Sequence, residues 1–350
     1  MANRVTLQTI ADRLGVSRTT VSNAYNRPDQ LAPALRERIL ATARELGYSG
    51  PDPAARRLRS GRRDVVGLLF TEALSYAFTD PAAVMLLQGI SRATAEAGMA
   101  LLLIPEHGSG VRNAVQDAVV DAFCLYSMPE DHPNVLAALE RGLPMVVVDE
   151  PRLDGHAYVG IEDRKGARLA AEHLVGLGHT RFAVLCERTR VDDYMGPLTE
   201  EREATVEYEI ERERLAGYRE VLEAAGIAWR PLPRFEVSGS HPEVGLAGGR
   251  ELLRADPRPT AILATSDQLA LGALEAARER GLGVPDELSV VGFDDIPGAA
   301  WAQPALTTVR QPLLEKGTIA GRMLIAESAE REVTLPVELV VRGSTAPPPA

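Results

Sequence analysis

The sequence predicts an α/β protein with a small all-helical head, followed by a body of two doubly wound lobes. The first observation is charge: residues 1–63 hold twelve arginines and five acidic side chains, a formal charge of +7. Residues 64–350 carry the remaining −18. The second observation is that short aliphatic runs alternate with amphipathic stretches from residue 64 onward, a pattern typical of right-handed βαβ units. A basic head on an acidic body favours a polyanionic partner bound at one end.

The first element of the head is a pair of short helices predicted within residues 5–24. Thr6 can cap the first helix, and Gly15 suits a left-handed position that ends it. Four apolar side chains recur at helical spacing in this first helix: Leu7, Ile10, Ala11 and Leu14. Ser17 can cap a second helix over residues 17–24. Two helices around a glycine-containing turn are typical of the helix-turn-helix, which places its second helix in the major groove of DNA.

The sequence of the rest of the head predicts a third helix followed by a basic linker. Residues 33–46 have one apolar face, formed by Leu35, Ile39, Ala43 and Leu46. Residues 47–63 are too basic and too poor in apolar side chains to pack as a core element. One apolar residue of this stretch, Leu58, stands among five arginines: Arg56, Arg57, Arg59, Arg62 and Arg63.

The aliphatic runs of the body predict two series of buried parallel strands. The first series comprises residues 65–70, 100–104, 122–126, 144–149 and 157–161, and the second comprises 181–186, 234–237, 261–265 and 288–294. Helices are expected between them, at 81–97, 111–119, 133–141, 165–177, 211–225, 242–254 and 267–280. Two such series predict two similar lobes with a ligand cleft at the carboxyl ends of the strands. The charged residues 187–213 are expected to form a solvated loop leading into a helix, with no assigned function.

Composition and motifs argue against several classes of protein. Cys124 and Cys186 each lie in an apolar run, which favours buried, reduced thiols. The sequence has no signal segment and no run near the roughly 20 apolar residues that span a bilayer, so we expect a cytoplasmic protein. The six histidines are scattered singly, and nucleophile-elbow, phosphate-loop, dinucleotide and zinc-protease motifs are missing. These observations argue against an enzyme, a metal site and a cofactor.

Several strings of the sequence, taken together and in order, resemble the lac repressor/galactose repressor (LacI/GalR) family of transcription factors. They are VTLQTIADRLGVSRTTVSNAYN, LRERILATARELGY and DPAARRLRSGR in the head, and GARLAAEHLVGLGH, RLAGYRE, SDQLALGAL, LSVVGFDD and LTTVRQP in the body. The resemblance covers nearly the whole chain. It implies a helix-turn-helix domain over 1–50, a hinge helix over 51–63 and a periplasmic-binding-protein-like effector domain over 64–343.

The resemblance also implies how the body is divided. In that fold the chain crosses between lobes three times, and we expect the crossings near 162–165, 293–297 and 322–328. Lobe 1 would then comprise about 64–162 and 296–322, and lobe 2 about 165–293 and 326–343. The last strand, 337–343, would lie in the second lobe. The proline-rich tail, 344–350, is expected to be disordered.

The family's DNA contacts map onto the head and linker. The implied contacts are Thr6, Ser17, Arg18, Thr19, Thr20, Ser22, Asn23, Asn26, Ala55, Arg56 and Leu58. Asn can pair with adenine and Arg with guanine in the major groove. Position 23 is arginine in the best-known members, so Asn23 implies a different operator sequence. Leu58 corresponds to the hinge leucine that wedges between base steps; the alternative is a solvent-exposed linker residue.

The family's effector contacts map onto the cleft. Asp163, Arg214 and Asp294 match ligand contacts, and a carboxylate and a guanidinium there can bind hydroxyl groups. The alternative for these residues is a structural ion pair between the lobes. Ser266 stands where many members have asparagine. Near predicted strand ends lie three aromatic residues that could stack on a ligand or pack in the core: Tyr76, Phe78 and Trp301.

These inferences predict a ligand-responsive, DNA-binding transcriptional regulator. We expect a repressor that works as a homodimer on a pseudo-palindromic operator, one half-site per subunit. Its effector is expected to be a small molecule, a sugar or a related metabolite, and its binding must be coupled reciprocally to operator binding. Two alternatives use the same cleft. A solute-binding protein would need a secretion signal rather than residues 1–63, and an α/β enzyme would need a nucleophile or cofactor motif.

Overall fold

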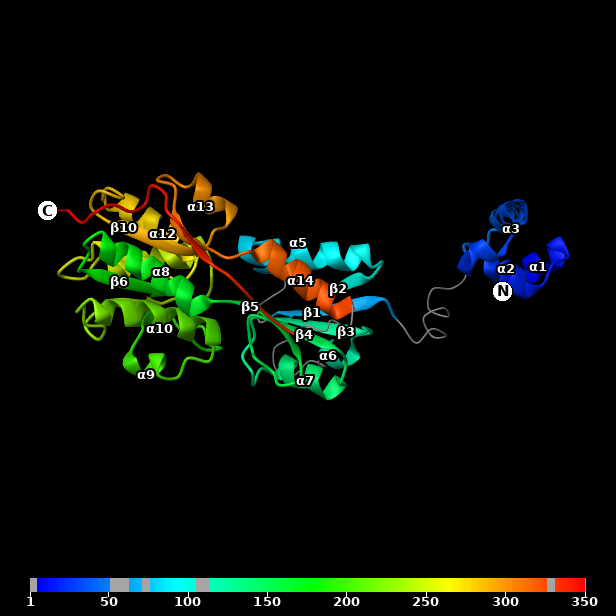
Figure 1. Cartoon of the computed structure of the whole chain (residues 1–350), viewed down its shortest axis with the longest axis horizontal. Helices are drawn as coiled ribbons and strands as arrows, with labels where there is room; N and C mark the ends of the chain where they lie inside the picture. The colour runs from blue at the N-terminus through cyan, green and yellow to red at the C-terminus, as the bar shows by residue number, and fades with distance from the viewer. Residues whose placement is uncertain (1–4, 51–62, 71–75, 105–113, 326–330, 350) are drawn as a thin grey trace. The chain divides into compact units, whose positions relative to one another are not determined.

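The computed structural model describes residues 5–50, 63–70, 76–104, 114–325 and 331–349. It divides the chain into two units, a head (Met1–Arg63) and a body (Asp64–Ala350) (Figure 1). Within the described residues, none of the helices has the length and apolar character needed to cross a lipid bilayer. The same residues include no group of three His, Cys, Asp or Glu side chains that could hold a metal ion.

The head is a helix-turn-helix followed by a third helix, as predicted. Its elements are α1 (Leu7–Leu14), α2 (Arg18–Asn26), the 3-10 helix η1 (Pro28–Gln30) and α3 (Pro33–Glu45). The Thr6 hydroxyl accepts a hydrogen bond from the backbone N–H of Thr9, and Gly15 ends α1 with φ of 66°. The Ser17 hydroxyl accepts from the backbone N–H of Thr20 and caps α2. Six side chains form the buried core between the helices: Ile10, Ala11, Val21, Ala24, Ile39 and Ala43.

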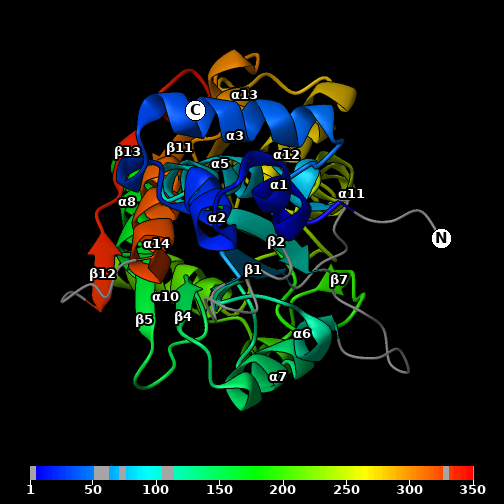
Figure 2. The same cartoon turned by 90° about the vertical axis from the view of Figure 1, so that its right-hand side faces the viewer.

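The first lobe of the body contains a six-stranded parallel sheet in the order β12-β5-β4-β3-β1-β2. The strands are β1 (Val65–Phe70), β2 (Ala100–Ile104), β3 (Ala122–Tyr126), β4 (Met145–Val148), β5 (Ala157–Ile161) and β12 (Glu332–Leu335). Helices α5 (Pro81–Glu96) and α14 (Leu313–Ile325) cover one face, and α6 (Ala114–Asp117) and α7 (Pro133–Arg141) cover the other (Figure 2). Glycines let α5 and α14 approach closely, because a Cβ on Gly317 would lie 2.2 Å from the Leu86 carbonyl oxygen.

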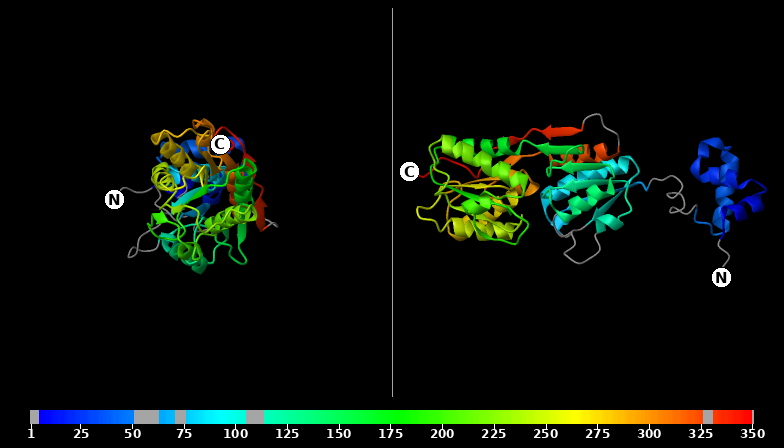
Figure 3. Two further views of the ribbon diagram at one scale, coloured as in Figure 1. Left: turned by 90° about the vertical axis from the view of Figure 1, so that its left-hand side faces the viewer. Right: turned by 90° about the horizontal axis from the view of Figure 1, so that it is seen from below.

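The second lobe contains a seven-stranded sheet in the order β13-β11-β10-β9-β6-β8-β7. The strands are β6 (Phe182–Cys186), β7 (Gly196–Pro197), β8 (Arg234–Glu236), β9 (Ala261–Ala264), β10 (Ser289–Asp294), β11 (Thr307–Arg310) and β13 (Glu338–Val340). Helices α8 (Asp163–Gly176) and α10 (Glu209–Ala224) pack on one face, and α11 (Pro242–Leu252) and α12 (Asp267–Glu279) pack on the other (Figure 3). The predicted α/β class with doubly wound lobes is confirmed.

Two of the three predicted crossings between lobes are wrong. After β10 the chain passes through α13 (Pro297–Trp301) and returns as β11, which pairs in parallel with β10. The chain therefore leaves the second lobe only between β11 and α14, and not near 293–297. The strand β12 also belongs to the first lobe, where it pairs with β5, and the chain returns to the second lobe just before β13. The expectation missed β11 and β12 because each has only four residues with mixed polarity, and only pairing with a neighbour makes them strands.

The prediction of a disordered tail is wrong for its first residues. Ser344 is fully buried; its hydroxyl accepts from the backbone N–H of Thr307 at 2.8 Å and donates to the Val290 carbonyl at 2.6 Å. The backbone N–H of Ala346 donates to the Ser289 hydroxyl at 3.1 Å. The hydroxyl and backbone groups of the tail thus extend the hydrogen bonding of the second sheet, although the proline content of the segment suggested otherwise.

Residues 187–213 also depart from the expectation of a solvated loop. The segment contains β7 and a short helix, α9 (Glu200–Glu203). Thr189 is fully buried, and both its hydroxyl and its backbone N–H donate to the Glu236 carboxylate. The Arg202 guanidinium pairs with this same carboxylate at 2.7 Å and with Asp192 at 3.1 Å. Thr189 and Arg202 therefore attach the segment to the second sheet, although acidic residues such as Asp193 and Glu201 remain exposed.

Candidate functional site

The exposed face of α2 is the candidate nucleic-acid surface. Arg18 and Thr19 are exposed and Asn23 is partly exposed, whereas Val21 and Ala24 point into the head core. Among the described residues, the side chains of Arg18, Thr19 and Asn23 make no hydrogen bond within the head, so their polar groups remain available to a partner. Side chains of this type at the start of a second helix are suited to base edges and phosphates.

The other predicted contacts of the head have local partners or lie outside the described residues. The Ser17 and Thr20 hydroxyls bond each other at 2.8 Å at the start of α2, and Asn26 donates to the Ser22 hydroxyl at 3.1 Å. Thr6 is exposed and caps α1. The expected hinge contacts, Ala55, Arg56 and Leu58, lie in residues 51–62, outside the described part of the chain.

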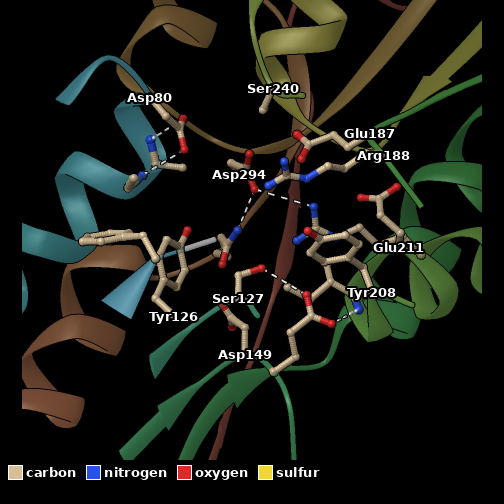
Figure 4. Close-up of a pocket in the computed structure, with 17 residues that line it drawn as sticks. Asp80, Tyr126, Ser127, Asp149, Glu187, Arg188, Tyr208, Glu211, Ser240 and Asp294 are labelled. Atoms are coloured by element: carbon tan, nitrogen blue, oxygen red, sulfur yellow. Dashed lines mark hydrogen bonds and ion pairs between the residues drawn. The ribbon is translucent and has the colours of Figure 1, made fainter. Parts of the chain in front are cut away.

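The body holds a pocket at the carboxyl ends of strands from both sheets (Figure 4). The space inside it that can hold the centre of a water molecule is about 110 Å³. Phe70 and Tyr126 end β1 and β3 of the first lobe, and Asp294 ends β10 of the second. The other lining residues follow strands or begin helices: Asp80, Ala82, Ala83, Ser127, Asp149, Glu150, Glu187, Arg188, Tyr208, Ile210, Glu211, Arg214, Ser240 and Gln311.

The backbone of the pocket wall is strained. Five described non-glycine residues have positive φ, and three of them line the pocket: Ser127 at 47°, Asp149 at 69° and Asp294 at 120°. Such conformations cost free energy for residues with a Cβ and persist where the surrounding structure imposes them. Their concentration here, at strand ends from both lobes, is typical of a functional site.

Arg214 stands at the centre of an ion cluster in the second lobe. Its Nε lies 2.9 Å from Asp163 Oδ1, and one terminal nitrogen lies 2.6 Å from the Thr265 carbonyl oxygen. The same nitrogen lies 4.0 Å from Asp294 Oδ1, and the guanidinium covers the Phe293 ring at 3.8 Å. Burial alone would lower the pKa of Arg214, but Asp163 and Asp294 raise it above its ordinary value. Arg214 therefore stays charged and is both a structural residue and part of the pocket wall.

A second cluster links the two lobes. Lys316 of α14 is 1% exposed, and its Nζ lies 2.7 and 2.8 Å from the two carboxylate oxygens of Asp149. The same Nζ donates to Gln311 Oε1 at 2.6 Å, and Gln311 Nε2 donates to Asp294 Oδ1 at 2.6 Å. Gln311 lies between β11 and α14, where the chain crosses between lobes. A continuous path of charged and amide groups thus joins the first-lobe wall of the pocket to the second-lobe wall.

Three carboxyl groups of the pocket have strongly raised pKa values, and for Asp294 burial is the main cause, opposed in part by Arg214. Burial raises the pKa of Glu150 to about 8, although hydrogen bonds from Ser127 and the start of α10 lower it in part. Burial raises the pKa of Glu211 to about 8 as well, and nearby Glu187 adds to the increase. Arg214 and a hydrogen bond from Thr265 lower the Glu211 value in part.

The raised pKa of Glu211 predicts a pH-dependent effect of Glu211→Gln. The folded-state pKa lies above the ordinary value of 4.5, so the parent binds more protons folded than unfolded between about pH 4.5 and 8. The contribution of Glu211 to the free energy of unfolding is therefore lost as pH rises through that window. We expect Glu211→Gln to raise the melting temperature more at pH 8.5 than at pH 5. A constant difference between variant and parent across this range would contradict the raised pKa.

The structure brings only some of the predicted effector residues to the pocket. Arg214 and Asp294 line it, and Asp163 holds Arg214 from behind without lining the pocket. Ser266 caps α12, and its hydroxyl lies 3.1 Å from that of Ser240, which does line the pocket. Phe78 and Trp301 were wrongly expected to line it: they are 62% and 85% exposed. Tyr76 begins the 3-10 helix η2 (Tyr76–Phe78), but its side chain is not among the described ones.

Three aromatic and several acidic residues of the pocket were not predicted from the sequence. Phe70 and Tyr126 end predicted strands, and Asp149 and Glu187 end or follow them. The rule that ligands bind at the carboxyl ends of parallel strands would have indicated these positions if applied to every strand. Tyr208, Ile210 and Glu211 had no such signal, because they lie in the charged excursion whose path depends on tertiary contacts.

Comparisons with known proteins agree with this architecture. Residues 6–50 match the family described as bacterial regulatory proteins, lacI family, and residues 171–345 match the periplasmic binding protein-like domain. An HTH-type transcriptional regulator of Mycobacterium tuberculosis is 42% identical over 99% of this chain and 98% of its own length.

Two solved structures show the same arrangement over nearly the whole chain. The lac repressor dimer bound to operator and the anti-inducer ONPF has a TM-score of 0.77 at 27% identity, covering 98% of this chain and 100% of that one. The complex of the transcriptional regulator CelR with cellobiose has a TM-score of 0.69 at 31% identity, covering 97% and 100%. With its helix-turn-helix head, its two-lobed body and these full-length relatives, the chain belongs to the LacI family of bacterial regulatory proteins and is a DNA-binding transcriptional regulator.

Proposed function

We propose that this regulator is a homodimeric repressor that binds a pseudo-palindromic operator and responds to a sugar or a related metabolite in the body pocket. The observation that carries the proposal is the path from Lys316 through Gln311 to Asp294, because it joins the two lobes at the pocket wall. A ligand that touches this wall contacts both lobes at once. It can therefore favour one lobe geometry over another.

The pocket has the groups that a sugar would need. Arg188 and Arg214 can donate hydrogen bonds to hydroxyl oxygens, and the Ser127 and Ser240 side chains can donate or accept. The rings of Phe70, Tyr126 and Tyr208 can cover an apolar C–H face. The CelR relative, whose solved structure contains cellobiose, supports this assignment.

The DNA contacts are proposed from the face of α2. Arg18 and Asn23 would read bases, and the remaining predicted residues of the head would position the helix on phosphates. Arg56 and Ala55 of the hinge would add backbone contacts, and Leu58 would wedge between base steps and bend the duplex. The operator-bound dimer of the lac repressor supports both the dimer and the two half-sites.

The experiment that tests the proposal measures both activities on the full chain. Operator DNA is first selected from a random pool, and a panel of sugars and related metabolites is then screened for thermal stabilisation. Any hit is titrated into the protein–operator complex. Ligand and operator must change each other's affinity by the same factor. A hit that binds the pocket but leaves operator affinity unchanged would reject effector control.

Asn23→Ala tests base recognition. We expect it to weaken binding to the selected operator by about 1–3 kcal/mol and to relax one position in each half-site. The slope of affinity against salt should stay at the parent value, because an asparagine that reads a base neutralises no phosphate. Site selection with the variant checks this result. An unchanged consensus would mean that Asn23 reads no base.

A further inference from the structure

Glu211 is the pocket group whose hydrogen bonding the protein leaves incomplete. It lies in the first turn of α10, is 4% exposed and lines the pocket. Its Oε2 atom has no hydrogen-bond partner among the described residues. A buried acceptor without a donor is costly, so its retention at a pocket wall indicates that a ligand supplies the donor.

Three other carboxylates of the pocket already have partners in the protein. Asp149 is paired with Lys316, and Asp294 accepts from Gln311. Asp80 accepts the backbone N–H groups of Ala82 and Ala83. Figure 4 shows Glu211 beside Glu187, Arg188 and Tyr208, on the side of the pocket opposite Asp80 and Tyr126. On this side of the pocket a donor therefore meets the open acceptor of Glu211 beside the partly exposed carboxylate of Glu187.

The helix starts that face the pocket are occupied by the protein's own carboxylates. Helix N-termini are ordinary binding places for phosphate and other anions. Here Glu150 accepts from the backbone N–H groups of Glu209 and Ile210 at the start of α10, and Asp80 does the same at the start of α5. An anionic ligand would have to compete with these groups.

The buried cations at the pocket are also already paired. Six acidic side chains line the pocket, Asp80, Asp149, Glu150, Glu187, Glu211 and Asp294, against two arginines, Arg188 and Arg214. Burial raises the pKa of Glu150 and of Glu211 to about 8, so these two carboxyl groups add little negative charge at neutral pH. Arg214 is held by Asp163, which lies outside the pocket, and Lys316 is held by Asp149, so neither buried cation is left for an anionic ligand.

We propose that Glu211 forms a hydrogen bond with the effector and that the occupied helix starts and the paired buried cations restrict the effector to hydroxyl-rich molecules without negative charge. Phosphorylated sugars and sugar acids are excluded. This inference rests on the proposed function and names the class of ligand within it.

The first test compares matched ligands on the full chain by thermal shift and calorimetry. The panel contains uncharged mono- and disaccharides and sugar alcohols, each beside its phosphate or its carboxylate, for example ribose beside ribose 5-phosphate. We expect each uncharged compound that binds to do so at least tenfold more tightly than its anionic partner. An anion that binds as tightly as its uncharged partner overturns the inference, and so does a panel in which no uncharged compound binds. Operator binding by the same sample shows separately whether the regulatory function stands.

The second test replaces the carboxylate. Glu211→Gln should weaken the best uncharged ligand about 10- to 100-fold and reduce its advantage over the anionic partner, while raising the melting temperature without ligand. Glu213→Gln is the matched control, because Glu213 lies on the same helix but pairs with Arg164 away from the pocket; its ligand affinity should stay within twofold of the parent. If Glu211→Gln lowers the melting temperature or leaves ligand affinity unchanged, Glu211 is a structural residue and the inference fails.

Discussion

Operator affinity is expected to fall about 10³-fold as salt rises from about 50 to 200 mM, if roughly six phosphates are neutralised per complex. The cause is the +7 formal charge of residues 1–63, because each arginine that contacts a phosphate releases bound counterions. The rest of the chain carries −18, so it is expected to repel DNA and to add nothing to this slope. Fluorescence anisotropy with a labelled operator at several salt concentrations measures the slope of affinity against salt.

Two arginine variants locate the origin of this salt dependence. Arg18→Ala, on the exposed face of α2, removes two arginines from the proposed dimer; it should reduce the slope by about two if Arg18 contacts a phosphate, and should leave it unchanged if Arg18 only reads a base. Arg230→Ala is the control, because this body residue is exposed and pairs with Glu200; its slope should equal that of the parent. Operator affinity that is independent of salt would contradict an ionic head.

Lys316→Met should lower the free energy of unfolding of the body by about 3–5 kcal/mol. The sequence has two lysines, and this one is buried with its Nζ at 2.7 and 2.8 Å from the Asp149 oxygens. Methionine keeps most of the volume but removes the charge, which leaves the Asp149 carboxylate uncompensated in the interior. The same variant breaks the path to Gln311, so coupling between effector and operator should weaken in whatever protein remains folded. Urea unfolding followed by circular dichroism measures the loss.

Two further variants separate this ion pair from general effects of losing a lysine. Lys165→Met removes the other lysine, which is exposed and pairs with Glu162, and should cost at most about 0.5 kcal/mol. Adding Asp149→Asn to Lys316→Met removes the uncompensated charge and should recover part of the lost stability. If Lys316→Met is as stable as the parent, or if the double variant is less stable than the single one, the pair does not hold the pocket wall.

Local features of the sequence determined the head and most elements of the body. The caps Thr6 and Ser17, the turn at Gly15 and the core positions Ile10 and Val21 each act over one or two helical turns, so they could be recognised without tertiary contacts. The aliphatic strands β1, β3, β4 and β10 were recognisable for a related reason. Strands buried on both faces require continuous apolar runs, and few other elements do.

Features that depend on residues far away in the sequence could not be predicted in the same way. The strand β11 has four residues of mixed polarity, and its pairing with β10 fixes where the chain leaves the second lobe. Trp301 and Phe78 looked like ligand-stacking residues because they are aromatic and near predicted strand ends, yet both side chains face away into solvent. An aromatic side chain favours contact with apolar groups, but its residue type does not show whether the fold places such groups beside it.

Some features of the pocket could likewise be predicted from local sequence, whereas others depend on distant residues. The family, the helix-turn-helix and two pocket residues, Arg214 and Asp294, could be predicted because they depend on motifs that are continuous along the chain. That Lys316 and Gln311 join the lobes and that Glu211 keeps an open acceptor could be learned from the folded molecule alone. Burial and partner choice set the state of a charged side chain, and both are produced by residues far away in the sequence.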